Sequence, residues 1–445
     1  MKKIITLLLV AMMCLSAFVA CAAPAAEGEP TVAPATETPA AEAPVSEAPA
    51  APVELNVVTS YGGDDGNRVN YEAGIAAYEA ATGNTVLDAS ATSNEEWRAK
   101  VMTDFETGTE PDVLFYFSGV DANALIEGNK LVSLEEIRAE YPDYASNMKE
   151  SMLPASPVDG KQYAVPVNGY WEGLFVNKAV LEAAGVAVPG ADYTWDQFLA
   201  DCEKIKAAGF TPVAVSLQEV PHYWFEYSVL NNGSIANHLE IPAAADDAVA
   251  QKWAAGLADI TELYTKGYLP ANTLTATDAE TCQLMIDGTA AFLIDGSWKV
   301  GFFKENAADH LDDYTVTYVP GKGERVATEV ISGMSMGYYI TRKAWDDPAK
   351  REAAVKFVEM MTADDIVSTF GATAVTALKN GATAPTDADS LTLAAIQMNT
   401  GVTGFVSAVQ DGLTPEARGD LFGHIKDIVT GGMTAQDALA SMLTK

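Results

Sequence analysis

Short apolar runs alternate along this chain with segments in which apolar residues recur every three to four positions. The runs 55–59, 85–87 and 111–117 predict strands. Tyr71 and Tyr78 lie between the first two runs at helical spacing and predict a helix there. The third run is apolar almost throughout, which is typical of a parallel strand buried on both faces. The alternation therefore predicts an α/β fold in which helices flank doubly wound sheets.

The N-terminus has the pattern of an exported protein. A basic start precedes the apolar stretch 4–15, which predicts a secretory signal peptide over residues 1–20 and is too short to span a membrane. Residues 18–21, Phe-Val-Ala-Cys, resemble the lipobox of bacterial lipoproteins, so we predict lipid attachment at Cys21; the alternative is an ordinary signal with an incidental cysteine. Residues 21–53, rich in Ala, Pro, Glu and Thr, predict a disordered tether because they hold little apolar surface. We expect the folded part to stand at the extracellular face of a bacterial cell membrane, held there by the lipid.

Composition narrows the choice of partners. The 445 residues suffice for two lobes, and 61 acidic against 27 basic residues give a net charge of −34, so we expect no nucleic-acid partner. Cys202 lies on an apolar helical face and predicts a buried thiol, while a disulfide with Cys282 stays open. The four histidines form no metal-binding cluster, and the glycines at 62, 63 and 66 match no phosphate-loop pattern. We therefore expect neither a metal nor a cofactor.

Large aromatic residues fall where strands are predicted to end or where the chain changes direction. The apolar run 290–294, for example, stops at Asp295-Gly296 and is followed by Trp298. Open α/β sheets bind ligands beyond the carboxyl ends of their strands. Sugars present apolar C–H faces and hydroxyl groups, so their sites need flat aromatics beside carboxylates and amides. The aromatics so placed are Tyr61, Tyr116, Tyr170, Trp171, Trp224 and Trp298. Core packing is the alternative for each of them.

Several short motifs follow one another in a specific order over residues 55–445. They lie at 105–113, 159–166, 176–178, 184–185, 194–198, 206–212, 288–292, 296–298 and 337–340, and they include Asp159-Gly-Lys-Gln-Tyr-Ala-Val-Pro166 and Gly296-Ser-Trp298. In this order and spacing they resemble the extracellular solute-binding proteins of ABC importers, specifically the carbohydrate-binding group that includes maltose-binding proteins.

The resemblance implies a two-lobed periplasmic-binding-protein fold of type II character, each lobe a doubly wound sheet, with the ligand cleft between the lobes. The first lobe would comprise residues 54–167 plus about 330–385, and the second 168–329 plus about 386–445. The lobes would close over a sugar and present a surface to a membrane permease.

Residue by residue, the resemblance implies ligand contacts at strand ends, at the first crossing between lobes and in the loop after residue 217. The matching residues are Tyr61, Asp64, Tyr116, Ser118, Tyr170, Trp171, Glu219, His222, Trp224, Trp298 and Gly333. Maltose-type members present a stacking Trp near the C-terminus, where this chain has Arg418-Gly-Asp420. That departure argues against a maltodextrin ligand.

We therefore expect a monomeric, non-enzymatic receptor that captures a mono- or oligosaccharide and delivers it to the permease subunits of an ABC transporter. One alternative is a secreted glycoside hydrolase, whose carboxylate pair would come from Asp64, Glu172, Glu219, Glu226 and Asp295. Another is a sugar-sensing accessory protein of a signalling system. The identity, length and linkage of the sugar stay open.

Overall fold

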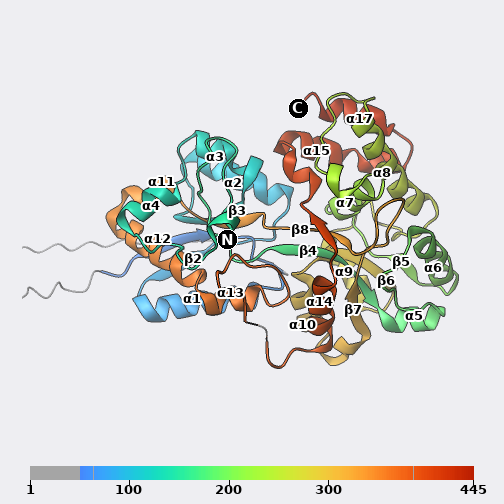
Figure 1. The fold of residues 1–445 in the computed structure, drawn as a ribbon, viewed down its shortest axis with the longest axis horizontal. Helices are drawn as coiled ribbons and strands as arrows, with labels where there is room; N and C mark the ends of the chain where they lie inside the picture. Colours follow the sequence, from blue (N-terminus) through green and yellow to red (C-terminus); the bar gives the residue numbers. More distant parts are fainter. Residues whose placement is uncertain (1–50, 64, 384) are drawn as a thin grey trace, which may run out of the picture. The chain divides into compact units, whose positions relative to one another are not determined.

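The structure, a computed structural model, describes residues 51–63, 65–383 and 385–445. The predicted signal peptide, Cys21 and Asp64 lie outside these residues. Among the helices described, none has both the length and the apolar character that crossing a membrane requires. The described chain forms two sheets covered by helices, in agreement with the predicted α/β class (Figure 1).

The first sheet has the strand order β2-β1-β3-β9. β1 (Glu54–Val58) pairs in parallel with β2 (Thr85–Asp88) and β3 (Val113–Phe117), as the apolar runs predicted. β9 (Met336–Ile340) comes from much later in the chain and pairs antiparallel with β3. A late segment of the sequence therefore completes a sheet that the early segment begins.

Helices cover both faces of the first sheet. They are α1 (Arg68–Thr82), α2 (Glu95–Thr107), α3 (Asn123–Glu127), α4 (Leu134–Glu140), α11 (Arg342–Asp346), α12 (Pro348–Met361) and α13 (Asp364–Phe370), with the short 3-10 helices η1 (Gly119–Ala122) and η2 (Glu150–Met152). α1 packs Tyr71 and Tyr78 into a core shared with α12 and α13, which are drawn in orange beside the blue α1 in Figure 1. α2 begins at Asn94, whose side chain accepts a hydrogen bond from the Trp97 backbone at 2.8 Å, and packs the Trp97 ring into the core on the other face.

The second sheet has the strand order β10-β8-β4-β6-β5, and β7 also pairs with β4. Its strands are β4 (Tyr170–Asn177), β5 (Thr211–Val213), β6 (Ala290–Gly296), β7 (Tyr314–Thr317), β8 (Glu329–Gly333) and β10 (Gly404–Val406). β4 is central and runs antiparallel to β6, β7 and β8. The first residue of β4 therefore lies at the same end of the sheet as the last residues of β6 and β8.

Helices cover the second sheet as well. They are α5 (Lys178–Ala184), α6 (Trp195–Ala207), α7 (His222–Asn231), α8 (Ala248–Thr265), α9 (Asp278–Ile286), α10 (Lys299–Asn306), α14 (Ser390–Thr400), α15 (Pro415–Gly423), α16 (Ile425–Val429) and α17 (Ala435–Met442), with η3 (Ile235–Asn237), η4 (Ala308–Asp313) and η5 (Val409–Gly412). α6 starts with a reciprocal capping box between Thr194 and Gln197. Cys202 and Cys282 are buried free thiols, so the disulfide left open by the sequence does not form.

The chain passes between the two sheets in the segments 167–170, 333–336 and 378–391. At the first two crossings Tyr170 opens β4 directly opposite Gly333, the last residue of β8. Gly169 is crowded here, since a Cβ on it would lie 2.5 Å from the Gly333 carbonyl oxygen. The start of β4, where the chain enters the second sheet, thus meets the end of β8, where the chain leaves it, and the candidate site is built there.

Candidate functional site

Three aromatic side chains gather where β4 begins and β6 ends. Trp298 follows β6 and precedes the first turn of α10, Tyr170 is the first residue of β4, and Tyr223 lies in the first turn of α7. The Trp298 ring centroid is 6.4 Å from that of Tyr170 and 6.2 Å from that of Tyr223. All three side chains are partly buried. We call these three residues the aromatic cluster.

Two carboxyl groups, Glu172 of β4 and Glu226 of α7, lie beneath the aromatic cluster. Alternation along β4 puts Glu172 on the same face as Tyr170, and helical spacing puts Glu226 on the same face as Tyr223. The Glu172 residue is 2% exposed and Glu226 is 0% exposed. The Gln410 side chain donates to Oε1 of Glu226 at 3.2 Å, whereas Oε2 of each glutamate receives no hydrogen bond from a nitrogen or hydroxyl among the residues that the structure describes. We call Glu172 and Glu226 the carboxyl pair.

The electrostatics of the carboxyl pair favour protonation. Burial raises the pKa of Glu172 well above its usual range, and the negative charge of the adjacent Glu226 raises it further. Burial likewise raises the pKa of Glu226, and Asp411 adds to the effect. Two desolvated carboxylates in contact cannot both be charged without a cation, so in the ligand-free protein the pair retains at least one proton near neutral pH.

Further acidic residues surround the carboxyl pair. Burial raises the pKa of Asp411 to about 6, and it raises that of Asp295 to about 7 even though the Lys299 ammonium acts in the opposite direction. Lys299 Nζ lies 3.1 Å from an oxygen of Asp278 and 3.5 Å from one of Asp295. Ligand atoms of Asp278, Cys282 and Asp295 come within 4.8 Å of one another, but the Lys299 ammonium already supplies the positive charge at this cluster. The arrangement does not favour a metal there.

The loop after β1 of the first sheet lies against this site. A Cβ on Gly66 would be 2.1 Å from the carbonyl oxygen of Trp298 and 2.8 Å from Cα of Gly301, so the two backbones approach as closely as glycines permit. The neighbouring Asp65 has its pKa raised to about 6 by burial, with Lys299 acting in the opposite direction. The loop that follows β1 of the first sheet thus packs against the start of α10.

A second contact between the elements of the two sheets is an ion-pair network around Arg418 of α15. Its guanidinium donates to Oδ1 of Asp121 at 2.8 Å and to Oε1 of Glu95 at 3.0 Å. Arg98 donates to the other Asp121 oxygen at 2.7 Å, and its guanidinium lies 3.5 Å from the Phe117 ring centroid. Arg418 is 1% exposed. The residue that replaces the expected C-terminal Trp therefore joins α15 to α2 and η1.

Some of the predicted site residues come together at the aromatic cluster. Tyr170 and Trp298 are two of its three members. The His222 ring centroid is 4.2 Å from that of Tyr223, and burial lowers the pKa of His222 to about 3, so this imidazole is neutral. A Cβ on Gly333 would lie 3.3 Å from the Tyr170 ring, so a side chain at this position would crowd the ring.

Four predicted aromatics pack in the cores instead. Tyr61, Tyr116, Trp171 and Trp224 are 4%, 1%, 0% and 2% exposed. The Trp171 indole nitrogen donates to the Thr373 carbonyl at 2.7 Å. These rings have the core packing that the sequence left as the alternative, and a ligand contact for them stays a prediction.

The remaining predicted residues have local structural partners. The Ser118 hydroxyl donates to the Ser335 carbonyl at 3.0 Å. The exposed Glu219 carboxylate accepts a hydrogen bond from the Asp278 backbone at 2.8 Å and so caps the first turn of α9. Asp64 is outside the described residues. Ligand contacts at all three stay predictions.

Sequence reasoning overlooked Tyr223 and assigned Glu172 and Glu226 only to the alternative hydrolase. A signal was present, because Tyr223 and Glu226 are three positions apart on one helix and Tyr170 and Glu172 are two positions apart on one strand. Each pair therefore points to one side of its element. What the sequence could not reveal is that α7 lies over β4.

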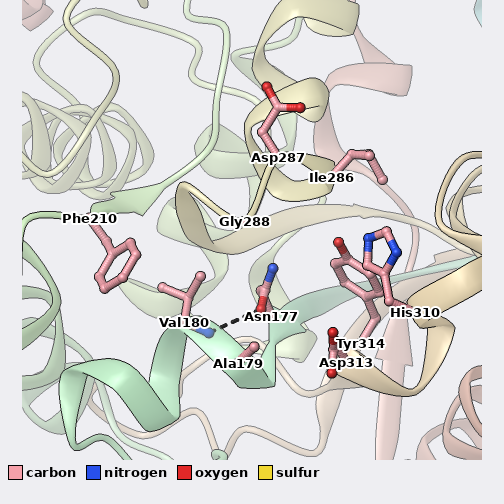
Figure 2. Close-up of a pocket in the computed structure, with 10 residues that line it drawn as sticks. All are labelled: Asn177, Ala179, Val180, Phe210, Ile286, Asp287, Gly288, His310, Asp313 and Tyr314. Carbon is pink, nitrogen blue, oxygen red and sulfur yellow. Dashed lines mark hydrogen bonds between the residues drawn. The ribbon is translucent and has the colours of Figure 1, made fainter.

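A separate depression of about 320 Å³ lies at the other end of β4. Figure 2 shows its lining: Asn177, Ala179, Val180, Phe210, Ile286, Asp287, Gly288, His310, Asp313 and Tyr314. β4 runs from Tyr170 to Asn177, so this depression is roughly 23 Å along the strand from the aromatic cluster. None of the predicted ligand residues lines it.

Two α/β sheets, joined by repeated crossings and meeting at an aromatic and acidic site, form the two-lobed fold of periplasmic binding proteins. The chain belongs to the bacterial extracellular solute-binding protein family, whose profile matches residues 66–367.

Sequence relatives are distant and only partly covered. A protein of Brucella abortus (strain 2308), named only as a binding protein, is 27% identical over 187 residues, which are 40% of this chain and 44% of that protein. An uncharacterized ABC transporter extracellular-binding protein of Pyrococcus horikoshii is 25% identical over 224 residues, or 48% of each chain. The matched segment thus spans less than half of these relatives.

Solved structures are similar over much more of the chain. A chitin oligosaccharide binding protein has a TM-score of 0.76 at 20% identity and covers 88% of this chain and 98% of its own. A protein from a study of xylan utilization by Caldanaerobius polysaccharolyticus has a TM-score of 0.74 at 16% identity, with 88% and 99% covered. The binding protein RafE in complex with raffinose has a TM-score of 0.67 at 17% identity, with 88% and 98% covered. At these identities the similarity establishes the fold.

Proposed function

We propose that this protein captures a sugar between two lobes and delivers it to the permease of an ABC transporter. The first lobe consists of residues 54–167 with a late segment ending near 385, and the second consists of the remainder of the folded chain. β8 pairs with β4 and β10, so we assign it to the second lobe and start the late segment at about 334.

The observation that carries the proposal is the aromatic cluster above the carboxyl pair. Partly exposed rings of Tyr170, Tyr223 and Trp298 suit the C–H face of a sugar, and the unpaired oxygens below them are hydrogen-bond acceptors for its polar groups. The site lies where the loop after β1 and the start of α10 touch, so a ligand there would contact both lobes. Proteins of similar fold bind chitin oligosaccharide and raffinose, which agrees with this ligand class.

The geometry favours binding over hydrolysis. Glycoside hydrolases hold their two carboxyl groups about 5–9.5 Å apart, so that a sugar, and in some enzymes a water, fits between them. Glu172 and Glu226 are instead close neighbours whose pKa values are both raised, chiefly by burial. We therefore propose a receptor without catalytic turnover.

Further parts of the proposal concern the cell surface. We propose that the chain is a monomer held at the outer face of the membrane by a lipid on Cys21. Cys21→Ser should release the full-length protein from the membrane fraction into the medium. Membrane association that is unchanged in this variant would exclude the anchor.

The main test is a calorimetric and thermal-shift screen of the purified full chain against mono- and oligosaccharides. A ligand that binds only the folded state raises the melting temperature by mass action, so one class of sugar should produce a clear shift. Trp298→Ala should lose at least about tenfold in affinity for that class, whereas Tyr264→Ala, which removes a partly buried ring of α8 outside the cluster, should retain it.

Two results would contradict the proposal. If no sugar shifts the melting temperature and none is bound calorimetrically, the ligand class is wrong. Turnover of a glycoside that disappears in Glu226→Gln would assign the site to a hydrolase.

A further inference from the structure

We propose that the sugar carries a free amino group and that the carboxyl pair Glu172–Glu226 receives its ammonium between Tyr170 and Tyr223. This inference rests on the proposed function and narrows it to amino sugars. It is supported by three features of the described residues: none of their cations pairs with either glutamate, two buried oxygens of the pair receive no hydrogen bond from a nitrogen or hydroxyl, and aromatic rings lie close by.

The carboxyl pair lacks a counter-charge in the described part of the chain. Neither glutamate has an ion-pair partner there, and the side-chain donor to the pair is the neutral amide of Gln410. The cations of the surrounding elements are already engaged: Lys299 by Asp278 and Asp295, and Arg418 by Asp121 and Glu95.

Acidic residues of two further elements, β6 and η5, act on the pair. Asp295 of β6 and Asp411 of η5 raise the pKa of Glu172. Burial raises the pKa values of the hydroxyls of Tyr170, Tyr223 and Tyr227, and the carboxyl pair in turn raises them further. The cation nearest to Tyr227 is the Arg325 guanidinium, 4.9 Å from its ring centroid and hydrogen-bonded to backbone carbonyls. A cationic ligand group would balance this local excess of carboxyl groups.

Hydrogen-bonding capacity matches an ammonium. An ammonium has three donors and no acceptor, whereas Oε2 of Glu172 and Oε2 of Glu226 are buried oxygens that receive no hydrogen bond from any nitrogen or hydroxyl of the described chain. Leaving a buried acceptor unpaired is unfavourable, and more so where the group is charged. One ammonium between them would satisfy both oxygens.

The surrounding rings add a second attraction. Tyr170 and Tyr223 both lie within electrostatic range of Glu172 and Glu226, and Trp298 stands between the two tyrosines. A cation close to the faces of Tyr and Trp is attracted by their π electrons. An amino sugar would present an ammonium to the pair and its ring to Trp298 at the same time.

Binding of an ammonium has a proton signature that binding of a hydroxyl lacks. In the free protein the pair retains a proton, and the ammonium replaces it: the protonated pair plus R–NH₃⁺ gives the complex plus one H⁺. Affinity then rises up to tenfold per pH unit as long as the pair is protonated and the amine is charged. A neutral sugar leaves the proton in place, so its affinity is flat with pH.

The experiment is isothermal titration calorimetry of the full chain at pH 5.5, 6.25 and 7.0, in two buffers of different ionisation enthalpy. The probes are D-glucosamine, D-galactosamine and β-1,4-linked glucosamine oligomers, each matched with its N-acetylated and its hydroxyl-bearing counterpart. We expect one amine to bind at least tenfold more tightly than its counterparts at pH 7.0, with release of about one proton.

Variants separate the pair from the rest of the site. Glu226→Gln should bring the affinity for the amine down to that of the neutral counterparts and remove its pH dependence. Glu172→Gln should act in the same way and serves if the first variant does not fold, while Glu305→Gln, an exposed glutamate of α10, should change neither quantity.

The outcomes are distinct. Neutral counterparts that bind as tightly as the amine, without proton release, would overturn the amino-sugar inference and leave the proposed function intact. An amine preference that persists unchanged in both Gln variants would also overturn it. If no probe and no other sugar binds, the proposed function fails together with the inference.

Discussion

Replacing Arg418 with alanine should weaken ligand binding more than it destabilises the fold. Arg418 lies on α15, whose apolar residues pack in a core of the second sheet, whereas Asp121 and Glu95 belong to elements of the first sheet. The ion pairs can form only when these elements are together. In the proposed two-lobed receptor they therefore stabilise the closed, ligand-holding arrangement.

The magnitude follows from what each partner loses. Asp121 is buried but keeps its 2.7 Å bond to Arg98, so it is not left without a cation. The side chain of Glu95 is 42% exposed and returns to water at little cost. The loss is then about one charge-assisted contact, about 2 kcal/mol, rather than the 3–5 kcal/mol of a fully broken buried pair. Two kcal/mol correspond to about 30-fold in affinity.

Calorimetric titration of the ligand and thermal unfolding of the free chain measure the two effects separately. Arg342→Ala is the matched control, because Arg342 also donates two hydrogen bonds to one carboxylate, Glu136, but within the elements of the first sheet. It should leave affinity unchanged and cost at most about 1 kcal/mol of stability. The reasoning is refuted if Arg418→Ala binds ligand normally while its melting temperature falls, because the network would then belong to the fold alone.

Three further results are expected. Gly66→Ala places a Cβ 2.8 Å from Cα of Gly301, so it should weaken ligand affinity by about five- to 150-fold with little change in the melting temperature. Normal affinity in this variant would exclude a close approach of Gly66 to Gly301 in the bound state. The melting temperature of the free chain should fall as the pH rises from 6.5 to 8, because the raised pKa values of Glu172 and Glu226 make the folded state bind more protons than the unfolded state. An equally steep fall of the melting temperature with pH in Glu226→Gln would contradict this cause. Trp171→Ala should cost about 3–5 kcal/mol in denaturant unfolding, because the ring is fully buried, and Trp171→Phe should cost less; a small loss in the alanine variant would contradict the core role.

Local sequence was sufficient where a residue's role depends on its own neighbours. Asn94 has the side chain that a helix start requires, and Thr194 with Gln197 forms a capping box because the two residues have the required spacing. Tyr170 and Trp298 were both predicted at the site because Tyr170 lies where a strand begins and Trp298 lies just after a strand ends. Such features need only a few adjacent residues, so the sequence alone predicts them.

The division between cleft and core needed the tertiary structure. Tyr170 and Trp171 are adjacent aromatics, yet alternation sends them to opposite faces of β4, where one joins the aromatic cluster and the other is 0% exposed. Both faces of this sheet are covered by helices, so no local pattern indicates which face opens to a ligand. For the same reason the sequence places Trp224 in a loop that could contact a ligand, whereas its ring packs in a core.

By itself the sequence determined the α/β elements, the acidic charge and the order of motifs that leads to the solute-binding family. Only the tertiary structure decided that α7 places Glu226 against Glu172, and that Arg418 reaches Glu95 across 323 positions of the chain. Strand and helix propensity act over a few residues, whereas burial of a charge depends on which distant elements pack together. The chemistry of the site is therefore a property of the packing between elements.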